Sequence, residues 1–406
     1  MRDLTLSKRI AFVAGTFDTK AAELTYMAEH IAASGVPVST IDLSTSKTSS
    51  KTDVSAAEIA ACHPDGESAV FTGDRGTAVA GMSKAFEQWV IKNQADIGGL
   101  ISAGGTGGTA LSTPAMRALP IGTAKVMVST VASGDVSPYV GPADIMMMYS
   151  VTDVQGLNRI SLQVLGNAAS ALAGMLKFTP DTALSNSKPG LGLMMFGVTT
   201  PAVQAISAHL NDTYECFVFH ATGVGGRSME KLVDSGLLSA VVDLTTTEVA
   251  DMMFGGVFAA VEDRFGAVIR QKVPYVGSVG ALDMINFGAP ETVPERFKDR
   301  LFYEHNPLTT LMRTTVEENT KMGEWIARRL NEMQGPVRFL LPEGGVSALD
   351  ATDAPFCDPD ARAALYASIE KHFESGDNRQ LVRLPHHIND AEFAAFAADS
   401  LREIAT

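Results

Sequence analysis

Residues 101–111 read Ile101-Ser102-Ala103-Gly104-Gly105-Thr106-Gly107-Gly108-Thr109-Ala110-Leu111, and this stretch decides the fold. An apolar run leads into four glycines within five positions, and a helix-like segment follows. Such a pattern predicts a buried strand, a tight turn and the start of a helix. Because glycine has no Cβ, a ligand can approach the backbone closely, and the first amides of the helix favour an anion. A phosphate or carboxylate is the expected ligand, and a turn that binds nothing is the alternative.

This turn differs from two familiar phosphate-binding motifs. It lacks the G-x-G-x-x-G spacing with a ribose-binding acid that marks dinucleotide sites, and no Gly-Lys-Ser/Thr follows it as in a P-loop. However, the same strand–glycine–helix pattern recurs at Gly15, Gly197, Gly223–Gly226 and Gly344-Gly345. Turns at the carboxyl ends of parallel strands share one edge of a sheet, where open α/β folds bind ligands. The recurrence therefore favours a functional anion site.

The composition is that of a large globular protein. Its 406 residues are enough for two domains of ordinary size, and 46% of them are hydrophobic against 19% charged. The formal net charge of −14 argues against a nucleic-acid partner, which would need clustered Lys and Arg. The three cysteines form no metal or disulfide pattern, the first nine residues form no signal peptide, and no apolar run reaches the ~20 residues of a membrane helix. We therefore expect a cytoplasmic protein with no membrane partner.

Strands and helices alternate along the chain, which predicts parallel sheets with right-handed crossovers. A stretch rich in Pro, Ser and Asn, from Phe178 to Gly190, interrupts the alternation and predicts a linker. We expect an α/β protein with two Rossmann-like, doubly wound lobes, residues 1–180 and 190–406, with mainly parallel sheets and a ligand cleft between the lobes. Thr309 to Met333 is expected to be one long helix, and the terminal helix from Asp390 to Ile404 is free to pack back on the first lobe.

The two lobes look like variants of one design. Gly15-Thr16 resembles Gly197-Val198, and Gly104–Gly108 resembles Gly223–Gly226. His220 ends the strand before the last of these turns, a position typical of a site residue. The similarity suggests duplication, in which both glycine-rich turns would serve one anion site.

The densest polar cluster after a strand runs from Asp243 to Asp251. Three threonines begin a helix there, and a capping box of Thr245 with Glu248 accounts for the glutamate. Capping does not need Asp243 or Asp251, which are therefore candidates to position a ligand hydroxyl or to bind Mg²⁺.

Candidates for acid–base chemistry are Asp18, His305 and Glu343. Asp18 lies in the first glycine turn, where capping the helix is the alternative role. His305 lies in an expected loop before a helix, and a plain loop residue is its alternative. On that helix, Arg313 suits bidentate binding of phosphate or carboxylate, and a salt bridge with Glu317 is its alternative.

In the order and wording of its motifs, the chain resembles the Tm-one-like ATP-binding domain family, named for the N-terminal domain of a tomato mosaic virus resistance protein. The matching segments are Gly15–Lys20, Gly104–Thr109, His220–Gly226, Asp243–Glu248, His305-Asn306-Pro307 with Leu311–Thr315, and Pro342–Ser347. The resemblance covers essentially the whole chain, and it implies two Rossmann-like subdomains with ATP and Mg²⁺ in the cleft between them. Stand-alone bacterial members have no agreed function, so the plant protein's binding of a viral protein is not carried over.

The leading hypothesis is a protein that binds ATP or a similar phosphorylated ligand, with Mg²⁺ on Asp243 and Asp251. The residues expected to hold the nucleotide are Thr16, Asp18, Thr19, Gly104, Gly105, Thr106, Gly107, Gly108, Thr109, Thr222, Gly223, Gly225, Gly226, Asp243, Thr245, Thr246, Thr247 and Arg313. The rival is a metabolic enzyme acting on a sugar acid or a similar phosphorylated or carboxylated metabolite. A third hypothesis is that the chain is an interaction protein, in which the bound nucleotide serves only to make the lobes more rigid. We expect a homodimer or a higher homo-oligomer.

Overall fold

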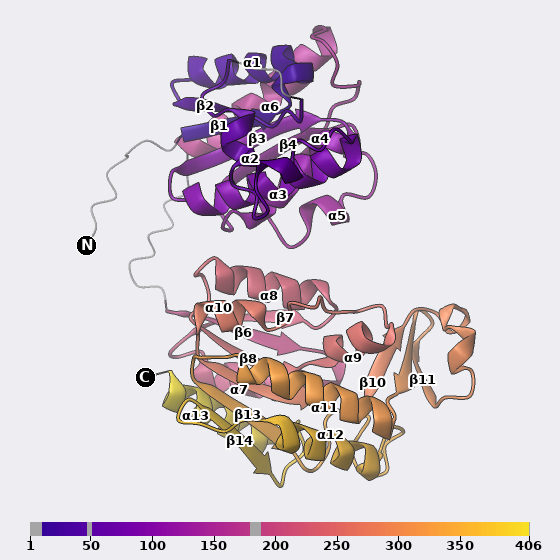
Figure 1. Ribbon diagram of the computed structural model, residues 1–406. Helices are drawn as coiled ribbons and strands as arrows, with labels where there is room; N and C mark the ends of the chain where they lie inside the picture. Colours follow the sequence, from indigo (N-terminus) through magenta and orange to yellow (C-terminus); the bar gives the residue numbers. More distant parts are fainter. Residues whose placement is uncertain (1–9, 47–50, 179–187, 406) are drawn as a thin grey trace. The chain divides into compact units, whose positions relative to one another are not determined.

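The computed structural model describes residues 10–46, 51–178 and 188–405. The chain divides into two compact units, residues 1–184 and 185–406 (Figure 1). Each unit is built around its own parallel sheet with helices between the strands, so the expected α/β class with two Rossmann-like lobes is confirmed. Most of the expected linker, residues 179–187, lies outside the described residues.

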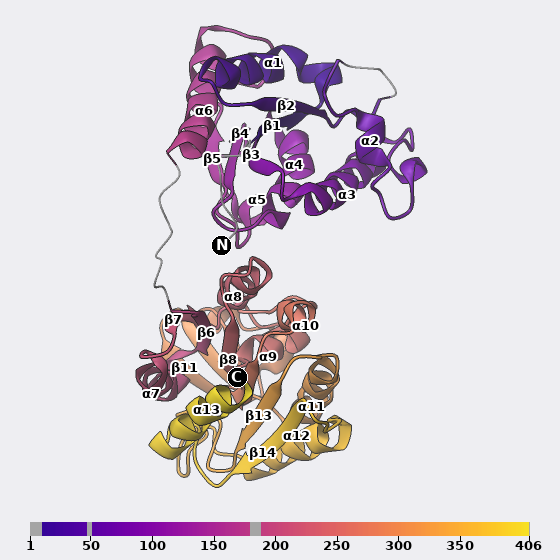
Figure 2. The ribbon, with the colours of Figure 1, turned by 90° about the vertical axis from the view of Figure 1, so that its left-hand side faces the viewer.

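The first unit contains a five-stranded parallel sheet in the order β2-β1-β3-β4-β5. Its strands are β1 (Ile10–Gly15), β2 (Val38–Asp42), β3 (Ile97–Gly104), β4 (Ala124–Ser129) and β5 (Met146–Tyr149). Its helices are α1 (Phe17–Ala33), α2 (Ala56–Ala60), α3 (Arg75–Asn93), α4 (Thr106–Ala118), α5 (Ser137–Val140) and α6 (Arg159–Lys177). Leu24 of α1 and Leu165 of α6 are buried on one face of the sheet, and Phe86 of α3 and Leu111 of α4 are buried on the other (Figure 2).

The second unit contains a six-stranded parallel sheet in the order β14-β13-β9-β8-β6-β7. Its strands are β6 (Gly190–Met195), β7 (Glu215–His220), β8 (Ala240–Thr245), β9 (Tyr275–Gly280), β13 (Val337–Pro342) and β14 (Arg379–Leu384). Its helices are α7 (Thr200–Leu210), α8 (Val224–Asp234), α9 (Thr247–Phe254), α10 (Gly266–Gln271), α11 (Val316–Asn331), α12 (Pro359–His372) and α13 (Ala391–Ile404). Met229 of α8 and Ile326 of α11 belong to the core on one face, whereas Ile206 of α7 and Phe393 of α13 belong to the core on the other.

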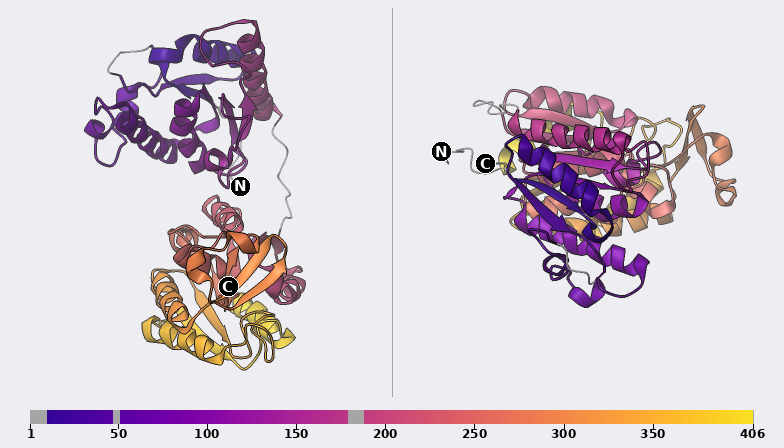
Figure 3. Two further views of the ribbon diagram at one scale, coloured as in Figure 1. Left: turned by 90° about the vertical axis from the view of Figure 1, so that its right-hand side faces the viewer. Right: turned by 90° about the horizontal axis from the view of Figure 1, so that it is seen from above.

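Between β9 and β13 the chain inserts a small antiparallel sheet in the order β10-β12-β11. Its strands are β10 (Met284–Phe287), β11 (Phe302–Asn306) and β12 (Thr309–Arg313), and they project from the unit (Figures 1 and 3). This insertion corrects two expectations, because β12 and α11 replace the single helix expected over Thr309–Met333, and His305 lies in a strand. A capping box between Thr315 and Glu318 begins α11 at Val316 and separates the helix from the strand.

The two sheets have the same strand order over their first four strands, which supports the similarity between the two lobes. Each sheet places its second strand at one edge, then its first, third and fourth strands, so β1, β2 and β3 correspond to β6, β7 and β8. The turns at Gly15 and Gly197 therefore both follow a first strand, as the sequence suggested. Gly104–Gly108 follows a third strand, whereas Gly223–Gly226 follows a second strand, so these two glycine-rich turns are not equivalent.

The terminal helix α13 packs within the second unit, against α7 and β13. Phe393 and Leu401 are fully buried there, because the helix presents one apolar face to the sheet. This placement replaces the option that the terminal helix packs back on the first lobe. Among the described residues, no helix is both long enough and apolar enough to cross a membrane.

Candidate functional site

In the first unit the strand order reverses between β1 and β3. The chain passes from β1 to β2 at one edge and then returns to β3 on the other side of β1. In open parallel sheets, ligands bind at the carboxyl ends of the strands beside such a reversal. The turns that leave β1 and β3 begin at Thr16 and Gly105, so both motifs expected from the sequence lie at this place.

The first turn of α4 is open. Gly105 is its N-cap residue and supplies no side-chain hydrogen bond. The amides of Thr106, Gly107 and Gly108 have no hydrogen-bond partner in the part of the chain that the structure describes. A Cβ added to Gly107 would meet nothing within 4 Å, and one added to Gly105 would lie 3.6 Å from Oγ1 of Thr130. The turn therefore offers three free donors to open space.

Hydroxyl groups around this turn mostly bind one another. Thr109 is buried, and its hydroxyl donates to the Gly105 carbonyl at 2.9 Å and lies 2.6 Å from Oγ of Ser129. Thr109 thus holds the turn in shape instead of facing a ligand. On the neighbouring turn, the hydroxyls of Thr16 and Thr19 lie 2.9 Å apart.

The first turn of α1 is closed by the chain itself. Thr16, not Asp18, is the N-cap residue, and the amide of Phe17 donates to the carboxylate of Asp42 at 3.2 Å. The amide of Asp18 donates to the hydroxyl of Ser44 at 3.0 Å. The carboxylate of Asp18 is exposed and accepts a hydrogen bond from Ser46 at 2.6 Å. Asp18 therefore remains reachable from solvent, whereas the α1 amides do not.

The second glycine-rich turn already holds an anion, and that anion is Glu248. Its Oε1 accepts hydrogen bonds from the amides of Gly223 at 2.6 Å and Gly226 at 3.1 Å. This contact corrects the expected capping box, because Thr245 instead donates its hydroxyl to the Met194 carbonyl at 3.1 Å. A carboxylate from α9 thus occupies the place that the sequence assigned to a phosphate.

Arg264, which sequence reasoning missed, is the centre of this buried region. Its guanidinium contacts Asp243 at 2.7 Å, Glu230 at 3.0 Å and Glu248 at 3.1 Å. Burial raises the pKa of Asp243 to about 6, although the guanidinium of Arg264 opposes the rise. The segment around Arg264 has no motif of its own, so only the fold could bring it to the acidic cluster.

The expected magnesium ligands have protein partners and lie in the interior. Asp243 is fully buried against Arg264. Asp251 is also buried and accepts hydrogen bonds from the amides of Phe258 and Asn286, each at 2.8 Å. Burial raises the pKa of Asp251 to about 7. Among the described residues, no three or more His, Cys, Asp or Glu side chains form a group that could hold a metal ion.

The remaining threonines of this cluster serve the fold as well. Thr246 donates its hydroxyl to the Ser278 carbonyl at 3.0 Å, and Thr247 accepts from the side chain of Asn286 at 3.4 Å. Thr245, Thr246 and Thr247 are all fully buried. Their hydroxyl groups therefore form hydrogen bonds inside the protein, where β8 leads into α9.

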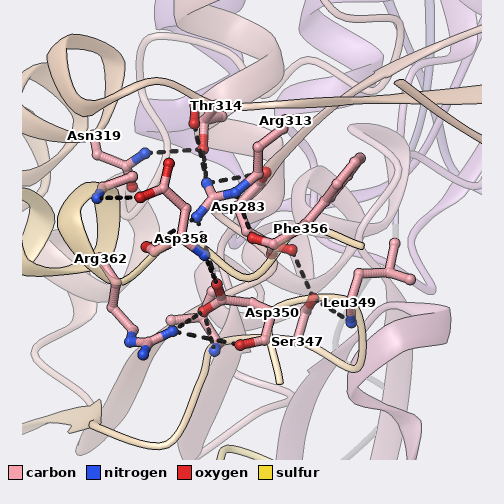
Figure 4. A network of polar contacts seen from close by, with 12 residues as sticks. Asp283, Arg313, Thr314, Asn319, Ser347, Leu349, Asp350, Phe356, Asp358 and Arg362 are labelled. Carbon is pink, nitrogen blue, oxygen red and sulfur yellow. Dashed lines mark hydrogen bonds and ion pairs between the residues drawn. The ribbon is translucent and has the colours of Figure 1, made fainter. Parts of the chain in front are cut away.

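Arg313 lies in a second buried polar network, drawn in Figure 4. Its guanidinium donates to the Phe356 carbonyl at 2.7 Å and to the Thr314 hydroxyl at 2.8 Å, and it lies 3.4 Å from Asp350. The alternative role, a salt bridge with Glu317, is not among these contacts, and Glu317 instead pairs with Lys321 at 2.7 Å. The side chain is 6% exposed. Arg313 therefore ties the loop after β13 to the insertion.

Two of the sequence's candidate residues and His220 meet at a hollow in the second unit. His305, Thr222 and His220 line it, and its volume is about 540 Å³, including space open to solvent. Glu343 is not among its lining residues and instead pairs with Arg383 at 3.3 Å on the surface. The hollow lies where β6 and β7 end.

Comparison with known proteins identifies the family. Residues 9–181 match the N-terminal domain, and residues 188–405 the C-terminal domain, of the uncharacterised protein family UPF0261. A UPF0261 protein of Mesorhizobium japonicum is 56% identical over 96% of this chain and 98% of its own length. A UPF0261 protein of Clostridium tetani is 42% identical over 98% of each chain.

A plant protein is similar to the chain as well. The ToMV resistance protein Tm-1(GCR237) of Solanum lycopersicum is 45% identical over 97% of this chain, which spans 55% of that protein. The resemblance carried by the sequence motifs is therefore confirmed at the level of the family. The chain belongs to the UPF0261 family.

Proposed function

We propose that the first unit binds a small phosphorylated molecule, with ATP as the leading candidate, on the open first turn of α4. One observation carries the proposal: the amides of Thr106, Gly107 and Gly108 have no partner in the described chain, at the point where the strand order reverses. Two other turns of comparable sequence are filled from within. Asp42 and Ser44 fill the start of α1, and Glu248 fills the start of α8.

The chemistry of the turn favours a phosphate. Three free amides at a helix start, together with the helix dipole, stabilise a compact negative charge. The hydroxyl of Thr130 lies beside Gly105 and adds a neutral donor. A side chain on Gly107 would project into open space, which is the volume that a phosphate would take. We therefore add Thr130 to the residues expected from the sequence.

Asp18 is the residue we assign to Mg²⁺. It is an exposed carboxylate on the turn next to α4, and Mg²⁺ in nucleotide sites is held by one or two carboxylates together with phosphate oxygens. Asp243 and Asp251 fit this role poorly, because both are buried and hydrogen-bonded to the protein.

Thermal unfolding tests the proposal directly. ATP, ADP, GTP and sodium triphosphate, each with MgCl₂, are added to the full chain. A ligand that binds only the folded state stabilises it by about 2.7 kcal/mol at a hundredfold excess over Kd. We expect ATP to raise the melting temperature. Unchanged melting with all four compounds at millimolar concentration would contradict the proposal.

A charge at Gly107 separates ligand binding from folding. Gly107→Asp places a carboxylate in the first turn of α4, where it suits the helix dipole and meets no neighbouring atom. The same carboxylate repels phosphate, so the shift caused by ATP should disappear while the unliganded protein stays folded. Gly174→Asp is the control, because Gly174 also has open space around its Cβ position but lies in α6. This control should keep the shift.

A further inference from the structure

The hollow in the second unit has the position of a ligand site of its own. It lies at the carboxyl ends of β6 and β7, and the β11–β12 hairpin forms another part of its wall. Small-molecule sites commonly have this place in parallel sheets. Its lining residues are Phe196, Gly197, Val198, His220, Thr222, Phe258, His305, Asn306, Thr309 and Leu311.

Aromatic rings form much of the wall. The rings of Phe196 and His220 lie 5.2 Å apart between centroids, and those of Phe196 and Phe258 lie 6.1 Å apart. Val198 and Leu311 add aliphatic surface. Rings at such distances and angles offer edges and faces against which another ring can pack. The wall therefore suits a planar ligand.

The polar groups of the hollow are imidazole, amide and hydroxyl groups. The imidazoles of His220 and His305 hold no hydrogen bond with any described residue, and an imidazole can donate or accept. The side-chain oxygen of Asn306 accepts from the Leu308 amide at 2.9 Å, which leaves the NH₂ group of Asn306 as a donor. Thr222 donates to the His220 carbonyl at 3.3 Å and keeps its lone pairs. Each group can therefore bind one hydroxyl or carbonyl of a ligand.

The hollow contains no Lys, Arg, Asp or Glu among its lining residues. Proteins commonly hold a polyphosphate with fixed cations, and no lining residue of this hollow supplies one. The lining therefore favours a ligand that differs in chemistry from the phosphorylated molecule assigned to the first unit.

We propose that this hollow binds a small planar aromatic molecule that carries a hydroxyl or carbonyl group and no phosphate. The ring packs against Phe196 and Phe258, and the oxygen exchanges hydrogen bonds with His220 and His305. The site is separate from the proposed phosphate site, since every lining residue belongs to the second unit.

Gly197 gives the sharpest test. It lines the hollow, and a Cβ added to it would meet nothing within 4 Å, so Gly197→Leu adds an apolar side chain at the hollow without a clash at its Cβ. Phenol and 4-hydroxyacetophenone are titrated into the full chain, and binding is followed by saturation-transfer NMR. Cyclohexanol serves as the non-planar probe. We expect both aromatic probes to bind and Gly197→Leu to weaken them at least tenfold, with little transfer to cyclohexanol.

Two controls keep this result distinct from the phosphate site. Gly174→Leu, outside the hollow, and Gly107→Asp, on α4, should bind the aromatic probes as the unchanged chain does. Gly197→Leu should in turn keep any melting shift caused by ATP. His305→Gln should weaken 4-hydroxyacetophenone several-fold, since glutamine keeps a hydrogen-bonding group but not the ring. The proposal is overturned if neither aromatic probe binds, if Gly197→Leu binds them equally well, or if sodium triphosphate displaces them.

Discussion

At Asp283, burial controls the protonation of a single carboxyl group. The residue is fully buried, its Oδ2 accepts from the Ser347 hydroxyl at 2.7 Å, and its Oδ1 has no partner among the described residues. Burial raises the pKa of Asp283 from its ordinary 3.8 to about 7, Asp350 adds to the rise, and Arg313 opposes it. Between a pH of 3.8 and a pH of about 7, Asp283 therefore keeps its proton in the folded protein and has lost it in the unfolded chain.

The stability of the protein should consequently fall as the pH rises. An acid whose pKa is raised by folding contributes stability below its unfolded pKa, and this contribution is lost as the pH rises through about 7. We expect unfolding free energy to drop by about 2–3 kcal/mol for this group between pH 5 and pH 8. Asp283→Asn, which cannot ionise, should flatten that slope in urea unfolding. A slope that is unchanged in this variant would sink the assignment.

Gly226 and Gly107 differ in how well their positions tolerate a side chain. A Cβ on Gly226 would lie 2.1 Å from Oε2 of Glu248, whereas one on Gly107 would meet nothing within 4 Å. Gly226→Ala should therefore cost about 2 kcal/mol or more, because it pushes away a carboxylate that the turn and Arg264 hold in place. Gly107→Ala should stay within about 0.5 kcal/mol. Denaturant unfolding of the two variants measures the difference, and equal costs would contradict it.

Among the elements, the strands next to the turns were the most predictable. β1, β3 and β7 are apolar runs that end at a glycine or polar turn, as the recurring strand–glycine–helix pattern predicts. β12 was mistaken for helix, because Thr309 to Arg313 continues into a helical sequence without proline or glycine. β9 was missed, although its apolar run after Pro274 could have revealed it.

The capping box at the start of α11 is the local signal that separates β12 from the helix. Thr315 accepts from the Glu318 amide at 3.2 Å, and Glu318 accepts from the Thr315 amide at 2.7 Å. Thr315→Ala should therefore cost about 1 kcal/mol of unfolding free energy. Thr320→Ala, on the exposed side of the same helix, is the control and should cost much less. Similar losses in both variants would show that the box has no special role.

The candidate sites were harder to predict than the helices and strands. The side chains that accept hydrogen bonds from the amides of a turn come from residues far away in the sequence. Nothing near Gly223 in the sequence shows that its amide donates a hydrogen bond to Glu248, which lies 25 residues further along the chain. Arg264 is equally remote from the acids that it neutralises. The open turn of α4 agrees with the sequence, since β3 ends at Gly104 and the glycines that follow it offer no capping side chain. Sequence thus indicates where anions can bind, and packing decides which turns stay free.

At the scale of the whole molecule, each unit has its own sheet and its own buried cores. The apolar clusters around Leu100 and Ile101 belong to the first unit, and those around Val241 and Val242 belong to the second. A domain with its own core commonly unfolds as one cooperative step. We therefore expect two transitions in calorimetry, one for each unit.

The two transitions should respond to different changes. Arg264→Met removes the only cation of a buried group of three acids, Asp243, Glu230 and Glu248, and breaking such a network costs about 3–5 kcal/mol. This variant should lower the transition of the second unit alone. ATP with Mg²⁺, which we assign to α4, should raise the transition of the first unit alone. Gly107→Asp should remove the ATP effect and leave the Arg264 effect intact. If ATP raised both transitions equally in the unchanged chain, the nucleotide would have to contact both units, and the assignment of its site to α4 alone would fail.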